Sequence, residues 1–266
     1  MPYDAIMIQI TEQQLDTIRD LAYRKYGLYI SQDKVSRLLP KLERFISHEG
    51  YSGTEELCSR LAAGDKVCLE KFSSYITTCH TYFFREPEHF RELAAEMRRS
   101  SRAFYTIWCA ACSTGEEPYS IAMTLIDGGI RNFHIIASDL NRNVLAEFNR
   151  GVYHESRLAQ TPPAARLRYF TPAGDDYYTI NRSLRNFISI KNINLMEAVR
   201  FPELFDYVFC RNVFIYFNEE SRSQAISTIT ANLKIGGSLF IGHAEVLLQQ
   251  PDNLEKTGSS IYRRMY

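Results

Sequence analysis

The chain has no excess of charge of either sign, because 31 basic residues balance 31 acidic ones. A neutral protein has no global basic field to hold nucleic acid, although a local basic patch remains possible. No apolar run approaches the ~20 residues that span a bilayer, and no secretory signal is present. The six cysteines do not have the spacing of a zinc site. These absences predict a cytoplasmic protein with free thiols, no membrane insertion, no nucleic-acid partner and no metal.

The chain has two regions of different pattern. Apolar residues recur at three- and four-residue spacing over residues 8–75, which predicts an all-helical domain at 1–77. After a linker at 78–99, apolar strands alternate with helices, which predicts an α/β domain that extends to residue 266. We expect a mostly parallel sheet with strands at 104–109, 133–138, 187–190, 206–210, 238–241 and 260–265, and a short strand at 254–257 that forms a closing hairpin with the last. The stretch 153–186 is too long for a plain connection and predicts an inserted subdomain.

A run of small residues joins the first of these strands to the helix after it. Ser113 or Thr114 is the candidate N-cap, and Gly115 would let a ligand approach unpaired backbone N–H groups. Cys109 and Cys112 fit small core or turn positions. The run predicts a site for a nucleotide-like cofactor, and the alternative is a plain turn without a ligand.

Polar residues also follow three further strands, at the edge where open parallel sheets bind ligands. Asp139 follows the second strand, where an acid would accept hydrogen bonds from ribose hydroxyls or would cap a helix. A dinucleotide site would have Gly-x-Gly-x-x-Gly after the first strand, whereas this turn has Gly115 alone. The pattern therefore favours an adenosyl cofactor without phosphates, such as S-adenosylmethionine, and predicts methyl transfer.

One helix in the first region carries a basic face. Lys34, Arg37, Lys41 and Arg44 share it at spacings of three, four and three. Such a face is either simply solvated or a docking surface for an acidic partner.

Five motifs together resemble the CheR family of chemotaxis receptor methyltransferases. They are Thr81–Glu86, Ser113–Ser120, Ala137–Asp139, Phe205–Val213 and Gly242–Glu245, in the order of the family. The resemblance implies a class I S-adenosylmethionine-dependent methyltransferase fold, which is Rossmann-like with a seven-stranded mostly parallel sheet. It also implies an N-terminal helical domain and a small antiparallel β-subdomain inserted at about 164–189. The family transfers methyl groups from S-adenosylmethionine to glutamate side chains on chemoreceptor cytoplasmic helices.

The resemblance also implies roles for individual residues. Glu117 and Asp139 would hold the adenosine and ribose end, and Thr81 and Arg85 would lie near the reacting end, with Tyr216 opposite. Arg85 and Tyr216 are the expected catalytic residues, although Arg85 could instead pair with an acid such as Glu86, and Tyr216 could be a core residue. The adenine and methionine portions would be lined by Asn194, Leu195, Cys210, Arg211 and Asn212.

The resemblance bears on partners as well. The basic face of Lys34, Arg37, Lys41 and Arg44 gains a plausible partner in the acidic receptor helices. In some members the inserted subdomain captures a peptide at the receptor C-terminus, but the compact, acidic stretch 174–178 predicts no such tethering here.

Two other functions compete with this interpretation. A methyltransferase for nucleic acid or a small molecule is one, but the Asn/Asp-Pro-Pro-Tyr motif of amino-methylating DNA enzymes is missing after the fourth strand. The other is a non-catalytic scaffold or sensor that binds the cofactor. Cys79, which the resemblance places at the amino-acid moiety of the cofactor, gives it some weight, because the family usually has Asn there.

Overall fold

The computed structural model describes residues 10–77, 79–100, 102–247 and 251–266, so residues 8 and 9 of the predicted helical stretch lie outside it. The chain forms two compact units. The helical unit comprises Met1–Thr78 and Tyr216–Arg222, and the sheet unit comprises Cys79–Ile215 and Ser223–Tyr266. The sequence pattern did not predict that Tyr216–Arg222 would group with the helices.

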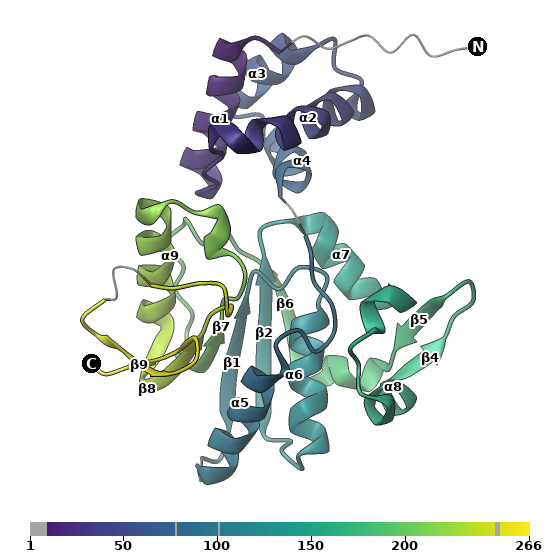
Figure 1. Ribbon diagram of the computed structural model, residues 1–266, viewed down its shortest axis with the longest axis vertical. Coiled ribbons are helices and arrows are strands. Elements are labelled where there is room, and N and C mark those ends of the chain that lie inside the picture. Colours follow the sequence, from purple (N-terminus) through teal and green to yellow (C-terminus); the bar gives the residue numbers. More distant parts are fainter. Residues whose placement is uncertain (1–9, 78, 101, 248–250) are drawn as a thin grey trace. The chain divides into compact units, whose positions relative to one another are not determined.

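The helical unit is built on amphipathic helices with well-formed ends. Thr11 caps the first helix in a reciprocal capping box with Gln14, and Gly27 ends it in the left-handed conformation. The apolar stripe predicted from the spacing is buried and includes Ile18, Leu42 and Phe45. The helices are α1 Glu12–Tyr26, η1 Gln32–Lys34, α2 Val35–Glu49, α3 Thr54–Ala62 and α4 Lys66–Ile76 (Figure 1).

The sheet unit contains the predicted seven-stranded, mostly parallel sheet. Its strands are β1 Tyr105–Ala110, β2 Phe133–Asp139, β6 Ile188–Asn192, β7 Phe205–Phe209, β8 Leu233–Phe240, β9 Leu254–Gly258 and β10 Ile261–Arg264. Their order is β6-β2-β1-β7-β8-β10-β9, and β10 pairs antiparallel with both β8 and β9. The strand order changes direction between β1 and β7, which makes this edge the expected place for a ligand.

Helices follow β1, β2 and β7, as predicted. They are α6 Glu116–Asp127, α7 Arg142–Arg150 and α9 Glu219–Asn232, and α5 Pro87–Arg99 precedes β1 (Figure 1). Aromatic side chains fill the core of the sheet unit, and the rings of Phe209 and Phe240 stack with centroids 4.3 Å apart. Trp108 is fully buried, and its indole N–H donates to the Ser138 hydroxyl at 2.8 Å.

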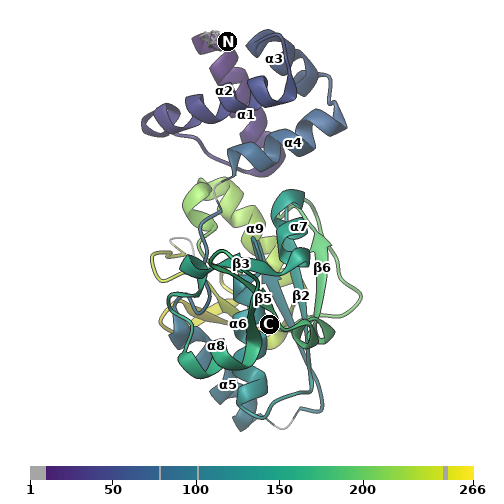
Figure 2. The ribbon, with the colours of Figure 1, turned by 90° about the vertical axis from the view of Figure 1, so that its right-hand side faces the viewer.

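The inserted subdomain is a small antiparallel sheet in the order β3-β5-β4. Its first strand starts at Val152, ahead of the expected start near residue 164, and residues 188–189 already belong to β6 of the main sheet. Its elements are β3 Val152–His154, η2 Glu155–Leu158, α8 Pro163–Tyr169, β4 Phe170–Pro172, β5 Tyr177–Ile180 and η3 Arg182–Phe187 (Figure 2). Within the described residues, no helix is long and apolar enough to cross a membrane.

Candidate functional site

The turn after β1 has an unusual backbone. Ala111, Ser113 and Gly115 all have left-handed φ angles, of 58°, 51° and 92°. Gly115 itself is the N-cap of α6 and makes no side-chain cap, so the predicted cap by Ser113 or Thr114 is wrong. The Thr114 hydroxyl instead donates to the Glu116 carboxylate at 2.6 Å.

Gly115 is required for packing as well as for its φ. A Cβ atom there would lie 2.2 Å from the ring of Phe148. The glycine therefore admits a neighbouring aromatic side chain rather than an approaching ligand. Cys109 and Cys112, beside this turn, are buried free thiols, as the sequence predicted.

Asp139, at the end of β2, is tied directly to this turn. Its carboxylate accepts the backbone N–H of Ser113 at 2.8 Å and that of Asn141 at 2.9 Å. Burial raises the pKa of Asp139, and the backbone N–H groups oppose that rise. The predicted ribose-binding acid and the predicted cofactor turn thus form one structure. The amide of Asn141 also lies 4.0 Å from the Cys79 sulfur, which brings that position to the same edge.

Arg211, after β7, is the centre of a buried charge group. Its side chain is 2% exposed and forms ion pairs of 2.9 Å with both Glu86 and Glu117. It also donates to the Arg85 carbonyl at 2.6 Å, and its guanidinium lies over the ring of Phe90. Two carboxylates and one guanidinium leave this group one negative charge in excess.

The pKa values of the two acids reflect this arrangement. Burial raises the pKa of Glu117, and the attraction of Arg211 opposes that rise. Burial also acts to raise the pKa of Glu86, but the charge and hydrogen bonds of Arg211 outweigh it, so the pKa of Glu86 is lowered. The arrangement favours the ionised form of Glu86.

The segment 79–86 carries the other expected cofactor residues. The Arg85 guanidinium donates to the His80 carbonyl at 2.9 Å and lies 5.8 Å from the centre of the Tyr82 ring. Its charge also opposes the rise in the pKa of Glu117, which places it near the Arg211 group. Glu86 pairs with Arg211, so the alternative of an Arg85–Glu86 ion pair is not what the structure shows.

Further expected cofactor residues follow β6 and β7. Leu195 and Cys210 are buried, while Asn194 is partly exposed and accepts the backbone N–H of Met196 at 3.1 Å. The amide of Asn212 approaches the Glu86 carboxylate at 3.4 Å. These residues occupy the same edge of the sheet as Asp139 and Arg211.

Sequence reasoning gave no role to Glu245, although the structure makes it a central residue. Its carboxylate is 5% exposed and accepts the backbone N–H groups of Gly242 at 2.7 Å, Asn212 at 2.9 Å and Ile215 at 3.3 Å. It therefore joins the ends of β7 and β8, and burial raises its pKa. The signal in the sequence is the polar end of the motif Gly242–Glu245, which follows the fifth parallel strand.

Two groups of predicted residues lie outside the sheet unit. Tyr216 belongs to the helical unit, where its carbonyl accepts the N–H of Tyr29 at 2.9 Å. On the basic face, Arg37 and Arg44 are exposed and Lys34 is half-buried. Lys41 differs, because its ammonium donates to the carbonyls of Ile76 and Thr77 at the end of α4. Lys41 therefore has a structural role in this unit.

One group of described residues has the composition of a metal site. Glu86, His89 and His243 place a carboxylate oxygen and two ring nitrogens within 4.8 Å of one another. Glu86 is already the counter-ion of Arg211, and burial lowers the pKa of His89 to about 4. Arg211 therefore competes with any metal ion for the Glu86 carboxylate.

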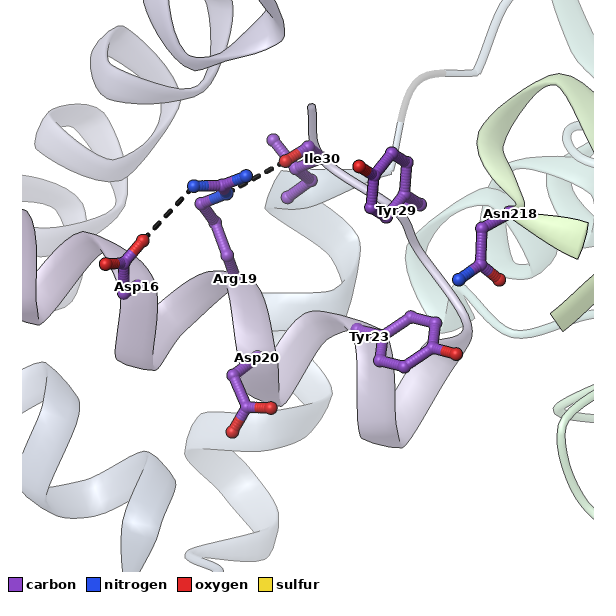
Figure 3. A pocket seen from close by; sticks show the side chains of 7 residues that line it. All are labelled: Asp16, Arg19, Asp20, Tyr23, Tyr29, Ile30 and Asn218. Carbon is purple, nitrogen blue, oxygen red and sulfur yellow. Dashed lines mark hydrogen bonds and ion pairs between the residues drawn. The ribbon is translucent and has the colours of Figure 1, made fainter. Parts of the chain in front are cut away.

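A cavity of about 330 Å³ opens on the helical unit (Figure 3). In it, Arg19 donates to the Ile30 carbonyl at 2.8 Å and pairs with Asp16 at 3.1 Å. Its lining residues are Asp16, Arg19, Asp20, Tyr23, Tyr29, Ile30 and Asn218. None of these is a predicted cofactor residue.

Comparison with known proteins identifies the family. Residues 79–263 match the model described as "CheR methyltransferase, SAM binding domain". The chain is 32% identical to the chemotaxis protein methyltransferase of Borreliella burgdorferi over 97% of this chain and 96% of that one. It is 31% identical to that of Salmonella typhimurium over 97% and 94%. A glycopeptide N-methyltransferase solved with S-adenosylmethionine aligns with a TM-score of 0.37 at 18% identity, over 62% of this chain and 58% of that one. The chain belongs to the CheR methyltransferase family.

Proposed function

We propose that this protein transfers a methyl group from S-adenosylmethionine to glutamate side chains of chemoreceptor cytoplasmic helices and gives glutamate methyl esters in chemosensory adaptation. The observation that carries the proposal is the ion-pair group of buried Arg211 with the partly buried Glu86 and Glu117. Its formal charge is −1, and it lies beside the turn that Asp139 holds. S-adenosylmethionine has a net positive charge from its sulfonium and ammonium groups, so the charges are complementary. The family model, which describes a domain that binds S-adenosylmethionine, agrees with this cofactor.

The residues present fit this cofactor without phosphate-binding glycines. Asp139 offers a partly buried carboxylate for ribose hydroxyls, and Glu117 lies in the first turn of α6 for the adenosine end. Buried polar atoms remain for a ligand, because the Ser113 hydroxyl and the Arg211 Nε have no hydrogen-bond partner among the described residues. We assign Thr81 and Arg85 to the reacting end of the cofactor.

The chemistry places few demands on the side chains. The bound cofactor supplies a methyl group activated by its positive sulfur. A substrate glutamate, with an ordinary pKa of about 4.3, is ionised at neutral pH and needs no general base. The protein must then orient the acceptor and exclude water, which is the role we propose for Arg85 and Tyr216.

Chemoreceptor helices are the proposed substrate, and the similarity to chemotaxis protein methyltransferases supports this choice. Their methylation regions are acidic, and Arg37 and Arg44 present exposed positive charge on α2. We propose that this face binds the receptor and that the reaction takes place in the cytoplasm. The non-catalytic alternative is not favoured, since the relatives are named as methyltransferases.

We further propose that the inserted subdomain does not capture a C-terminal receptor peptide. Its β4–β5 turn is compact, because the N–H of Tyr177 bonds the Gly174 carbonyl and that of Ala173 bonds the Tyr177 carbonyl, both at 2.8 Å. Asp175 and Asp176 in this turn would repel a terminal carboxylate. Calorimetric titration with a receptor C-terminal pentapeptide should give no binding heat.

The proposal is tested by cofactor binding and methyl transfer measured on the same preparation. Isothermal titration with S-adenosylmethionine should show one site, and labelled methyl groups should appear on receptor fragments as base-labile esters. Asp139→Asn should weaken cofactor binding by about tenfold or more, since it removes a charged acceptor. Asp127→Asn is the matched control, because Asp127 ends α6 and pairs with Arg168. Cofactor binding without ester formation on any receptor glutamate would refute the proposed reaction.

A further inference from the structure

Residues 79–86, which we call the cofactor segment, are hydrogen-bonded to one arginine of the inserted subdomain. Arg157 in η2 donates through Nη1 to the Thr81 carbonyl at 2.6 Å and to the Glu116 carboxylate at 3.1 Å. The backbone carbonyl of Arg157 accepts the N–H of Phe83 at 3.0 Å. One residue of the subdomain thus holds two points of the segment, on either side of Tyr82.

Glu116 makes the Arg157 contact energetically important. Its side chain is fully buried at the start of α6, where it also accepts the Thr114 hydroxyl. Burial raises the pKa of Glu116, and Thr114 and Arg157 oppose that rise. Arg157 is the cation paired with this carboxylate, and a buried carboxylate without its cation is costly.

Aromatic side chains also join the segment 79–86 to the inserted subdomain. Phe83, which is fully buried, sets its ring edge-to-face against Tyr153 and Phe170, with centroids 4.8 and 4.9 Å away. The Tyr153 hydroxyl donates to the Thr114 carbonyl at 2.7 Å. The subdomain therefore touches both the cofactor segment and the turn after β1.

The segment needs such external support. Phe84 and Glu86 have left-handed φ angles of 59° and 53°, which cost free energy for residues other than glycine. Phe84 is further held by its N–H bond to the Ser120 hydroxyl at 2.9 Å. A strained segment keeps one conformation only where its surroundings determine it.

We infer that Arg157 is a positioning residue for the cofactor segment, and that in this chain the inserted subdomain braces the cofactor site through the Thr81–Arg157–Glu116 contacts. The inference rests on the proposed function only in assigning cofactor contacts to Thr81 and Arg85. Arg157 itself acts through the carbonyl of Thr81 and the carboxylate of Glu116. The subdomain thereby serves the reaction without binding a receptor peptide.

The test compares variants of the full-length protein. For Arg157→Ala we expect the Kd for S-adenosylmethionine to rise about tenfold or more, since a charge-assisted bond to a buried carboxylate is lost. The KM for the cofactor should rise with it, while the KM for the receptor fragment stays unchanged. Arg157→Lys should recover part of the affinity, because an ammonium restores the charge but not both bonds. Arg166→Ala is the matched control, since Arg166 lies in the same subdomain and pairs with Glu155.

Several results decide the inference. Unchanged cofactor affinity in Arg157→Ala would overturn it, and so would an equal loss in Arg166→Ala. If Arg157→Ala is unstable, the double variant Arg157→Ala with Glu116→Gln removes the unpaired charge, and its cofactor affinity should still be reduced. A wild-type protein that binds cofactor but forms no glutamate ester would refute the proposed reaction and leave the binding comparison intact.

Discussion

At the scale of single residues, Arg211 connects the ends of β1 and β7 with the segment before α5. It pairs with Glu117 after β1 and Glu86 before α5, while its neighbour Asn212 is held by Glu245 from beyond β8. An arginine suits this position because its planar fork of donors serves several acceptors at once and stays charged when buried. The resemblance to the family pointed to Arg211, but only the structure shows that Glu86 is its second partner.

His89 predicts a pH dependence of stability. It is 1% exposed, and burial and then the charge of Arg211 lower its pKa from 6.5 to about 4. The folded state then binds fewer protons than the unfolded state between these values, so stability is lost as the pH falls from about 6.5 toward 4. The contribution is about 3 kcal/mol at pH 7. Chemical denaturation at several pH values should show the free-energy difference between wild type and His89→Gln shrinking over this range.

The comparison with His89→Gln separates the pH-dependent stability due to His89 from that due to the carboxylates. Burial raises the pKa values of Glu117, Asp139 and Glu245, and these groups stabilise the fold as the pH falls. They are present in both proteins and cancel in the difference. A constant difference from pH 7 to 4 would contradict the predicted role of His89.

At the scale of structural elements, the turn after β1 predicts a strong effect of a single methyl group. Gly115→Ala places a Cβ atom 2.2 Å from the Phe148 ring at a φ of 92°. Overpacking and left-handed strain together should lower the free energy of unfolding by about 2–4 kcal/mol. Gly174→Ala is the matched control, because its φ is 89° and its Cβ would meet nothing within 4 Å. That variant should lose only about 1 kcal/mol of stability, and thermal unfolding of the pair measures the difference.

The basic face of α2 gives a second prediction for an element. Charge reversal by Arg37→Glu and Arg44→Glu should weaken receptor binding and reduce its salt dependence, with little change in Tm, because both side chains are exposed. Lys41→Glu should also lower the Tm, since Lys41 donates to carbonyls at the end of α4. Binding titrations at two salt concentrations, with Lys66→Glu as a charge control in the same unit, test this. Equal receptor affinity for all variants would remove α2 from the interface.

The elements themselves were largely predictable, and their connections were not. Apolar periodicity and strand spacing depend on local sequence, so the seven strands and the closing hairpin were found from them. The helix cap at Gly115 was missed because the close approach of Phe148 is a tertiary contact with no local signal. The bond between Asp139 and Ser113 depends on the pairing of β1 with β2, which places their ends side by side. The partner Arg157 of Glu116 lies 41 residues away and could not be read from spacing.

At the scale of the whole molecule, the chain crosses between its two units more than once. It leaves the sheet unit after Ile215, contributes Tyr216–Arg222 to the helical unit, and returns at Ser223. In the helical unit, Leu28 pairs with Phe217 in an isolated β-bridge, the N–H of Tyr29 bonds the Tyr216 carbonyl, and Tyr23 bonds Glu220. A single boundary near residue 77 therefore does not separate the two units, because the later segment Tyr216–Arg222 also groups with the helical unit.

This crossing predicts the behaviour of the fragment 79–266. Phe217 is 9% exposed in the full chain, and the fragment lacks the residues that cover and bond the segment Tyr216–Arg222. We expect chymotrypsin to cleave after Tyr216 or Phe217 much faster in the fragment than in the full chain. In the fragment, the segment can unfold locally without breaking its contacts with residues of the helical unit, so it is exposed to the protease more often. Mass spectrometry of timed digests locates the cut. Cleavage in the exposed β4–β5 turn, after Tyr177, is the internal control and should proceed at the same rate in both. Equal rates at Tyr216 and Phe217 in the two proteins would show that the sheet unit alone holds this segment.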